Sequence, residues 1–287
     1  MAVDNDRHTP IRAYLEYFRD MGVYEFYRHG APVDLSGARR IAVEPLGSEP
    51  ALSPADPVSA AAASGHLSEP ELEPFIPKPV SLNDLIPLSL SRVAADDRTH
   101  ALEAIRAEIG DCTRCPLAYA GRRNIVFGAG DAKARLMFVG EGPGADEDEQ
   151  GLPFVGRSGQ LLTNMIQAMG LQRDEVYIAN IVMCRPPANR APEPEEATTC
   201  AQFLARQIDT VRPEYVVALG ATAATYLLGV RQSLASLRGR WHEVRGARAV
   251  VTYHPAFLLR DPRQKGEAWK DLQMVMAAMG LQGPKRG

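Results

Sequence analysis

Four cysteines are the residues whose type and spacing most directly suggest chemistry. Cys112 and Cys115 form a C-x2-C pair after a helical pattern, Cys184 follows an apolar run, and Cys200 lies on a helix predicted to begin near Pro194. Four thiolates can hold one metal centre, and both zinc and an iron–sulfur cluster accept that set. The alternative is four buried cysteines without a metal. The proline and polar residues around the C-x2-C pair favour the metal centre.

A loop rich in glycine and carboxylates follows the apolar run 136–139. It matches neither the dinucleotide-binding fingerprint nor a phosphate-binding P-loop, because the glycine spacing differs and no Lys-Ser/Thr follows. Its glycines let the backbone approach a flat ligand, its glutamates offer acid/base capacity, and its phenylalanine offers a stacking face. The alternative is a tight turn with solvated acids. The candidate substrate-binding residues in this stretch are Gly140, Glu141, Gly142, Pro143, Glu147 and Phe154.

An asparagine interrupts the apolar run 176–182. An amide inside a buried strand costs free energy unless it is paired, so Asn180 needs a partner. Its side chain can donate and accept hydrogen bonds together, which suits the edge of a nucleobase. Asn180 is therefore a further candidate substrate-binding residue.

A histidine directly follows the last apolar run, 249–253. Its position predicts that His254 points to the same end of the sheet as the glycine-rich loop, although a lone histidine is more often structural. In the loop that follows, Leu258 or Leu259 could enter a base stack while Arg260 meets a phosphate. This stretch is the candidate DNA-binding loop.

The elements that must position these residues alternate between strand and helix. Apolar β-rich runs are separated by helical patterns, which indicates an α/β fold with a parallel sheet covered on both faces. Ligands bind at the carboxyl ends of strands in such sheets. The expected strands are 136–139, 176–182, 215–219 and 249–253, and the expected helices include 221–228 and 266–279.

The chain divides by composition into three parts. Residues 97–287 read as one domain, and residues 31–96 as a Pro/Ala/Ser-rich linker too poor in apolar residues to order. Residues 1–30 form a short aromatic-rich segment expected to be helical. Its residues 7–30 either pack on the main domain or dock a partner protein.

Charge and hydropathy narrow the class of protein. The net charge of -3 combines an acidic first hundred residues with a mildly basic remainder, which permits a phosphate-binding face. No apolar run approaches the length of a membrane span, and the N-terminus lacks the pattern of a secretory signal. We therefore expect a cytoplasmic protein without a membrane partner, and a monomer.

Together these separated motifs resemble the family 4 uracil-DNA glycosylases, the iron–sulfur members of the uracil-DNA glycosylase superfamily. The resemblance runs from about Cys112 to Met279 and leaves the first hundred residues uncovered. The motifs that carry it are Gly140-Glu141-Gly142-Pro143-Gly144-x-x-Glu147-Asp148, Gly151-x-Pro153-Phe154-Val155-Gly156, Asn180 with Cys184-Arg185-Pro186-Pro187, and His254-Pro255-Ala256-x-Leu258-Leu259-Arg260.

The resemblance implies a three-layer α/β/α sandwich with a four-stranded parallel sheet and a [4Fe-4S] cluster on the four cysteines, with zinc as the alternative. It implies an enzyme that flips deoxyuridine out of DNA and hydrolyses its N-glycosidic bond. Phe154 is expected to stack on uracil and Asn180 to read its edge. The expected catalytic residues are His254, which stabilises charge on uracil, and Glu141, which orients water, with Glu147 as the second candidate base.

Two other functions remain open at this level. One related subfamily traps uracil-containing DNA covalently through a histidine in an inserted basic loop. Here Gly156 runs directly into a helical pattern, and no histidine lies between His100 and His242, which favours hydrolysis. The other is a non-catalytic nucleic-acid-binding module that keeps the fold and the metal centre.

Overall fold

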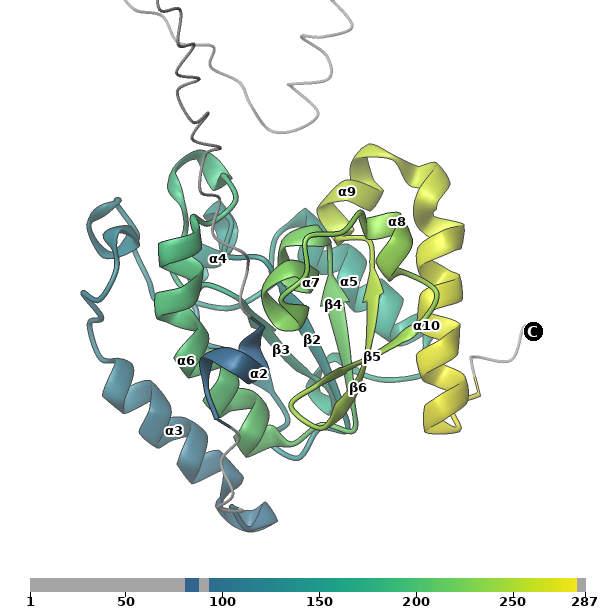
Figure 1. Ribbon diagram of the computed structural model, residues 1–287, viewed down its shortest axis with the longest axis horizontal. Coiled ribbons are helices and arrows are strands. Elements are labelled where there is room, and N and C mark those ends of the chain that lie inside the picture. The colour runs from purple at the N-terminus through teal and green to yellow at the C-terminus, as the bar shows by residue number, and fades with distance from the viewer. Residues whose placement is uncertain (1–80, 88–92, 283–287) are drawn as a thin grey trace, which may run out of the picture. The chain divides into compact units, whose positions relative to one another are not determined.

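A computed structural model describes residues 81–87 and 93–282, and its centre is a mixed sheet with strand order β1-β3-β2-β4-β6-β5 (Figure 1). The neighbours β3-β2-β4-β6 are parallel, as the sequence predicts, while β1 and β5 pair antiparallel at the two edges. These short edge strands are additions to the predicted four-stranded sheet. The bounds are β1 Ala129–Gly130, β2 Leu136–Gly140, β3 Tyr177–Asn180, β4 Tyr215–Leu219, β5 Trp241–Val244 and β6 Ala247–Thr252.

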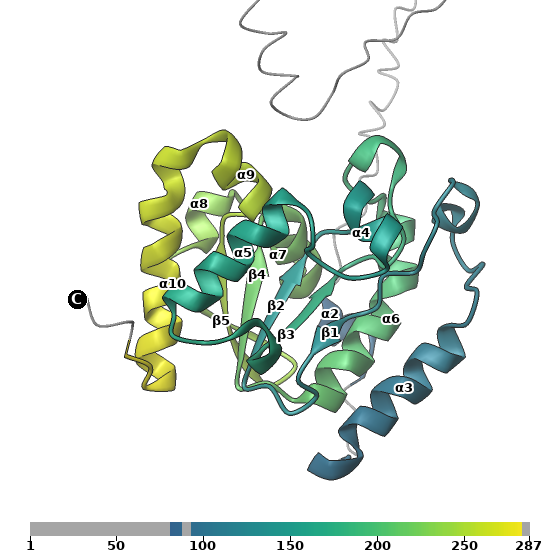
Figure 2. The same ribbon diagram turned by 180° about the vertical axis from the view of Figure 1, so that it is seen from behind.

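The central strands are mostly apolar because helices cover both faces of the sheet. In β2, Met137 and Val139 belong to one buried cluster, while Leu136 and Phe138 belong to the other. This alternation follows the two-residue period of a strand. In Figure 1 helix α7 (Ala221–Leu228) lies in front of the strands, whereas in Figure 2 helix α5 (Arg157–Ala168) does. The three-layer α/β/α prediction is thus confirmed.

Helices α3 and α6 supply apolar side chains to the first cluster, and α5 and α10 supply them to the second. Within the described residues the predicted helices form, and the structure adds short ones that apolar periodicity did not reveal, among them α4, α8 and α9. Within the described residues no helix is long and apolar enough to cross a membrane. The bounds are α3 Arg98–Ile109, α4 Ala145–Gln150, α5 Arg157–Ala168, α6 Pro194–Val211, α8 Leu234–Leu237, α9 Pro255–Arg260 and α10 Lys265–Met279.

One short part of the predicted 31–96 linker is folded, which corrects that prediction for residues 81–87. Helix α2 (Leu82–Leu85) contacts α6 and α7, and Leu82 is buried. The side chain of Arg245 donates to the carbonyl oxygens of Leu82, Ile86 and Pro87. Composition missed this because the partner lies about 160 residues away along the chain.

Other predictions for the N-terminal part concern residues outside those that the structure describes. They are the helical segment 1–30, its docking role through residues 7–30, and disorder over the rest of 31–96. All three stay predictions.

Candidate functional site

The carboxyl ends of three parallel strands meet at one cleft of about 400 Å³, which we call the base cleft. Gly140 at the end of β2 pairs in register with Asn180 at the end of β3, and His254 follows β6 by two residues. The structure therefore brings together candidates that lie more than a hundred residues apart. The base cleft is lined by Glu141, Gly142, Pro143, Gly144, Glu147, Phe154, Ser158, Asn180, Pro186, Asn189, Arg190, His254, Ala256, Phe257 and Arg260.

The amide of Asn180 has a buried oxygen without a partner. The residue is 3% exposed, and its Oδ1 accepts no hydrogen bond from any described residue. A buried polar atom left unpaired costs free energy, so the position demands a ligand that donates to it. Because Asn180 lines the base cleft, that donor is expected to arrive from the cleft.

Phe154 is held in an unusual backbone conformation beside the amide. Its φ of 53° is rare for a residue with a side chain, and its ring lies 5.6 Å from that of His254 between centroids. A Cβ on Gly140 would lie 2.5 Å from both the Phe154 ring and Asn180 Oδ1. Glycine at 140 is thus required for the ring and the amide to meet at the end of β2.

The carboxylate of Glu147 holds the loops around the base cleft together through hydrogen bonds. Its carboxylate accepts from the backbone N–H groups of Gly144, Val155 and Gly156 at 2.9–3.0 Å. These three bonds tie the start of α4 to the loop that carries Phe154. A carboxylate so engaged has little capacity left to take a proton from water.

Glu141 is the free carboxylate of the cleft. The residue is half-buried, and its carboxylate forms no hydrogen bond or ion pair with any residue that the structure describes. The adjacent Gly142 packs against β3's continuation, because a Cβ there would lie 2.8 Å from Val182 Cγ2. Position 142 thus has no room for a side chain unless Val182 moves.

His254 presents a neutral imidazole to the cleft. Burial, together with the nearby Arg260 cation, lowers the pKa of His254 to about 4, against the smaller opposing effect of Glu147. Its Nδ1 accepts from the backbone N–H of Ala256 at 3.1 Å and so caps helix α9. The ring proton therefore sits on Nε2, which leaves one hydrogen-bond donor for a ligand.

The three candidate DNA-binding residues lie on helix α9 and differ in their exposure to solvent. Leu258 is 1% exposed, so its predicted contact with DNA is wrong; the side chain packs inward on a helix that the sequence did not indicate. Leu259, the next residue along the helix, is 36% exposed, and Arg260 is exposed at the rim of the base cleft. Leu259 and Arg260 stay predictions as DNA contacts.

Several cleft residues were not found from the sequence. Arg190 holds the buried carboxylate of Glu196 with two hydrogen bonds, at 2.7 and 2.9 Å, and lines the wall. Asn189 accepts from Arg185 Nε at 2.7 Å in the same loop. The available signal was the Cys184-Arg185-Pro186-Pro187 motif, whose continuation carries both residues. Ser158 and Phe257 also line the cleft without having been predicted.

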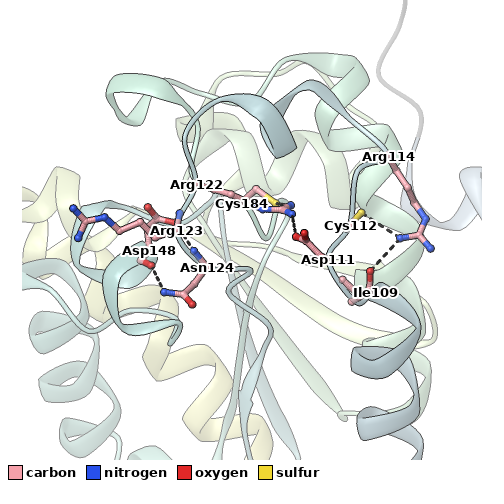
Figure 3. Close-up of polar contacts among 9 residues, drawn as sticks. All are labelled: Ile109, Asp111, Cys112, Arg114, Arg122, Arg123, Asn124, Asp148 and Cys184. Atoms are coloured by element: carbon pink, nitrogen blue, oxygen red, sulfur yellow. Dashed lines mark hydrogen bonds and ion pairs between the residues drawn. The ribbon is translucent and has the colours of Figure 1, made fainter.

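All four cysteines line a second, small cavity between α3, α6 and the segment after β3. They are free thiols, and arginines donate to two of them: Arg122 to Cys184 Sγ at 3.0 Å and Arg114 to Cys112 Sγ at 3.2 Å (Figure 3). Within the described residues, no group of three or more His, Cys, Asp or Glu side chains is arranged to hold a single metal ion.

Burial sets the protonation of the innermost thiols. It raises the pKa of Cys184, which Arg122 partly offsets, and raises the pKa of Cys200 to about 12. As free groups these thiols are neutral at pH 7. A metal centre binds thiolates, so it would form here with the release of the thiol protons.

The comparison with known families decides what this arrangement is. A family model described as the Uracil DNA glycosylase superfamily matches residues 127–273, a stretch that contains β2, β3, β4 and β6. The chain belongs to the uracil DNA glycosylase superfamily.

Similar proteins within this superfamily include members of two types. The type-4 uracil-DNA glycosylase of Thermotoga maritima is 45% identical over 57% of this chain and 86% of its own length. The type-4 enzyme of Pyrobaculum aerophilum is 43% identical over 60% of this chain and 92% of its own length. A type-5 uracil-DNA glycosylase of the same organism is 32% identical over 51% and 78%. The likeness to type-4 members confirms the resemblance to family 4.

Proposed function

We propose that this protein removes uracil from DNA by hydrolysing the N-glycosidic bond of deoxyuridine, leaving an abasic site for base excision repair. The named type-4 relatives are uracil-DNA glycosylases, and the fold and family agree with that activity. The observation in this chain that carries the proposal is the buried, unpartnered Oδ1 of Asn180 at the floor of the base cleft.

Uracil supplies the hydrogen-bond donor that the side-chain oxygen of Asn180 lacks. In our proposal uracil N3–H donates to Asn180 Oδ1, and the amide NH₂ donates to uracil O4. Cytosine reverses this pattern, because its N3 is unprotonated and its N4 is an amine. Phe154, fixed beside the amide by Gly140, stacks on the base. Uracil mispaired with guanine costs less to flip out of the helix than a well-paired base.

His254 and Glu141 have separate roles in the proposed reaction. As the glycosidic bond breaks, negative charge grows on uracil O2, and the Nε2–H of neutral His254 donates to it. The electron pair of the bond leaves with uracil as an anion, while water orientated by Glu141 attacks the sugar carbon from the opposite side and gives one proton to the Glu141 carboxylate. Glu147 positions the loops and is not the base, because three backbone N–H groups occupy its carboxylate.

We also propose a [4Fe-4S] cluster on Cys112, Cys115, Cys184 and Cys200. The four thiols lining one cavity fit its donor set, and the two arginines that donate to sulfur suit its negative charge. The cluster ties the segment before β1 to the segment after β3. Brown protein with about four iron atoms per chain is expected, and a colourless protein containing zinc would overturn this assignment.

A glycosylase assay tests the activity. Oligonucleotides that contain U·G, U·A, single-stranded uracil or hypoxanthine are incubated with the protein and cleaved with alkali. Abasic product is expected from uracil, and no product above background would contradict hydrolysis. A protein–DNA adduct that survives denaturation would instead support covalent trapping. We expect none, because α5 begins at Arg157, directly after Gly156, with no inserted loop.

The proposed cluster and the base cleft bear on the protein's location and oligomeric state. We propose that the protein acts on DNA in the cytoplasm, where thiols remain reduced and available to a cluster. We further propose that it works as a monomer, since one chain contains the whole base cleft.

A further inference from the structure

Arg173 is a half-buried arginine beside the loop that carries Phe154. It lies in the short helical turn Arg173–Glu175, between α5 and β3. Its Nη2 donates to the carbonyl oxygen of Pro153 at 2.6 Å, and its Nη1 donates to Thr163 Oγ1 at 3.1 Å. One guanidinium group thus joins the residue before Phe154 to the middle of α5.

The charge of Arg173 has no ion-pair partner among the residues that the structure describes. Burial lowers the pKa of Arg173, and the nearby carboxylate of Glu147 opposes that effect only in part. A half-buried charge without such a partner costs free energy, which the hydrogen bonds that it makes must offset. The bond to the Pro153 carbonyl oxygen is the shorter of the two, and bonds from a charged donor are stronger than those between neutral groups.

Arg173 also completes a ring of contacts around the backbone of Phe154. Thr163 Oγ1 donates to the carbonyl oxygen of Gly159, one turn earlier in α5. Gly159 lies directly against Phe154, because a Cβ at 159 would be 1.9 Å from the Phe154 carbonyl oxygen. Arg173 therefore connects Pro153 to the part of α5 on which Phe154 rests.

The backbone of Phe154 needs this support because its conformation is unfavourable. Its φ of 53° lies in the left-handed region, which costs free energy for a residue with a Cβ. The peptide group after Phe154 is held by Glu147, which accepts from the N–H of Val155. The peptide group before it is held by Arg173, through the carbonyl oxygen of Pro153. Each of the two peptide groups that flank Phe154 is thus fixed by a charged side chain.

We propose that Arg173 is a positioning residue for base recognition, which keeps the ring of Phe154 in the orientation that stacks on flipped uracil. The inference rests on the proposed function, in which Phe154 stacks on the base. Arg173 is not among the residues that line the base cleft, so it acts through Phe154 and not by its own contact with the base. Without its bond to Pro153, the Phe154 backbone can leave the left-handed region and the ring loses its place beside Asn180.

Equilibrium binding separates this role from a general contribution to stability. Fluorescence anisotropy measures the affinity for two single-stranded oligonucleotides. One contains 2′-fluoro-2′-deoxyuridine, whose fluorine slows loss of the base, and the other contains a tetrahydrofuran residue, which has no base. Arg173→Gln should weaken binding of the fluorinated strand about tenfold and leave binding of the tetrahydrofuran strand unchanged. Arg173→Lys keeps a donor for the Pro153 carbonyl oxygen and should recover most of the affinity.

A double-mutant cycle with Phe154→Ala tests whether the effect passes through the ring. In the absence of the ring, Arg173→Gln should cause no further loss of affinity for the fluorinated strand, because both substitutions remove the same stacking contact. Additive losses in the double variant would overturn the inference. Equal losses on the two strands in Arg173→Gln would overturn it as well.

Arg98→Gln is the matched control. Arg98 is also a half-buried arginine that donates to a backbone carbonyl oxygen, that of Val211 at 2.8 Å. Val211 precedes the amino end of β4, so this contact lies at the opposite end of the sheet from the base cleft. Arg98→Gln should leave the affinity for both strands unchanged, and a loss confined to the fluorinated strand would contradict the inference.

Cleavage of a deoxyuridine strand is measured separately, which keeps the two proposals apart. A protein that binds the fluorinated strand as expected but releases no uracil would refute the proposed function alone. Cleavage of deoxyuridine without a strand-selective loss of affinity in Arg173→Gln would refute the role of Arg173 alone.

Discussion

At the scale of single residues, the site depends on groups kept in a chosen protonation state by their surroundings. His254 is half-buried beside a cation, so it remains neutral where an exposed histidine would begin to charge. Its helix-capping bond to Ala256 selects the tautomer, and Asn180 supplies the complementary amide.

The lowered pKa of His254 predicts how stability depends on pH. Between pH 6.5 and about 4 the unfolded chain binds a proton at this histidine and the folded chain does not. The free energy of unfolding should therefore fall as pH decreases through this window. Denaturant unfolding at several pH values should show a shallower dependence for His254→Asn than for the unsubstituted protein. Parallel curves would contradict an imidazole that stays neutral in the folded chain.

Asn180→Asp tests the reading of uracil. A carboxylate cannot donate to uracil O4, so the ratio of cleavage on uracil to cleavage on cytosine should fall about 10- to 100-fold. Single-turnover rates on matched uracil and cytosine oligonucleotides measure this ratio. Asn164→Asp, on the exposed face of α5, is the control and should leave it unchanged. A selectivity equal to that of the unsubstituted protein would remove Asn180 from base recognition.

At the scale of elements, short helices position the site. Helix α4 is fixed at its start by Glu147 and near its end by Asp148, and α9 is capped by His254 itself. The close approach of α5 to the Phe154 loop needs glycine at 159, where a Cβ would lie 1.9 Å from the Phe154 carbonyl oxygen. The edge of the sheet at the base cleft thus consists of turns held in place by hydrogen bonds and close packing.

Substitutions of Glu141 and Glu147 should differ in their effects on steady-state kinetics and on stability. Glu141→Gln should lower kcat with little effect on stability, because its carboxylate is free in the cleft. Glu147→Ala leaves three backbone N–H groups without their acceptor, so it should raise KM and lower the free energy of unfolding by about 1–3 kcal/mol. Steady-state kinetics and denaturant unfolding of both variants provide the comparison. The reverse pattern would exchange their roles.

At the scale of the whole molecule, a buried arginine fixes where the N-terminal part of the chain joins the domain. Arg245 is paired with Asp209 and hydrogen-bonded to carbonyl oxygens at the end of α2, and its side chain is fully buried. The segment 81–87 is therefore part of the folded domain, whatever residues 1–80 do.

Removing this clamp should destabilise the domain. Arg245→Met leaves Asp209 and the α2 carbonyl groups without their partner, and breaking a buried pair costs about 3–5 kcal/mol. Arg135→Met removes an exposed pair and should cost less than about 1 kcal/mol. Thermal or denaturant unfolding compares the two. Equal effects would show that α2 is not held by Arg245.

The sequence by itself determined the strand–helix alternation, the four cysteines and the motif residues, because strand and helix periods and turn-forming residues are local properties. It therefore predicted the parallel sheet and placed Asn180 and His254 at the correct edge. It could not show that Leu258 faces inward, that Glu147 is occupied by three N–H groups, or that Arg245 captures residues 82–87. Those facts depend on contacts between distant segments, and burial and hydrogen-bond partners exist only once the chain has folded.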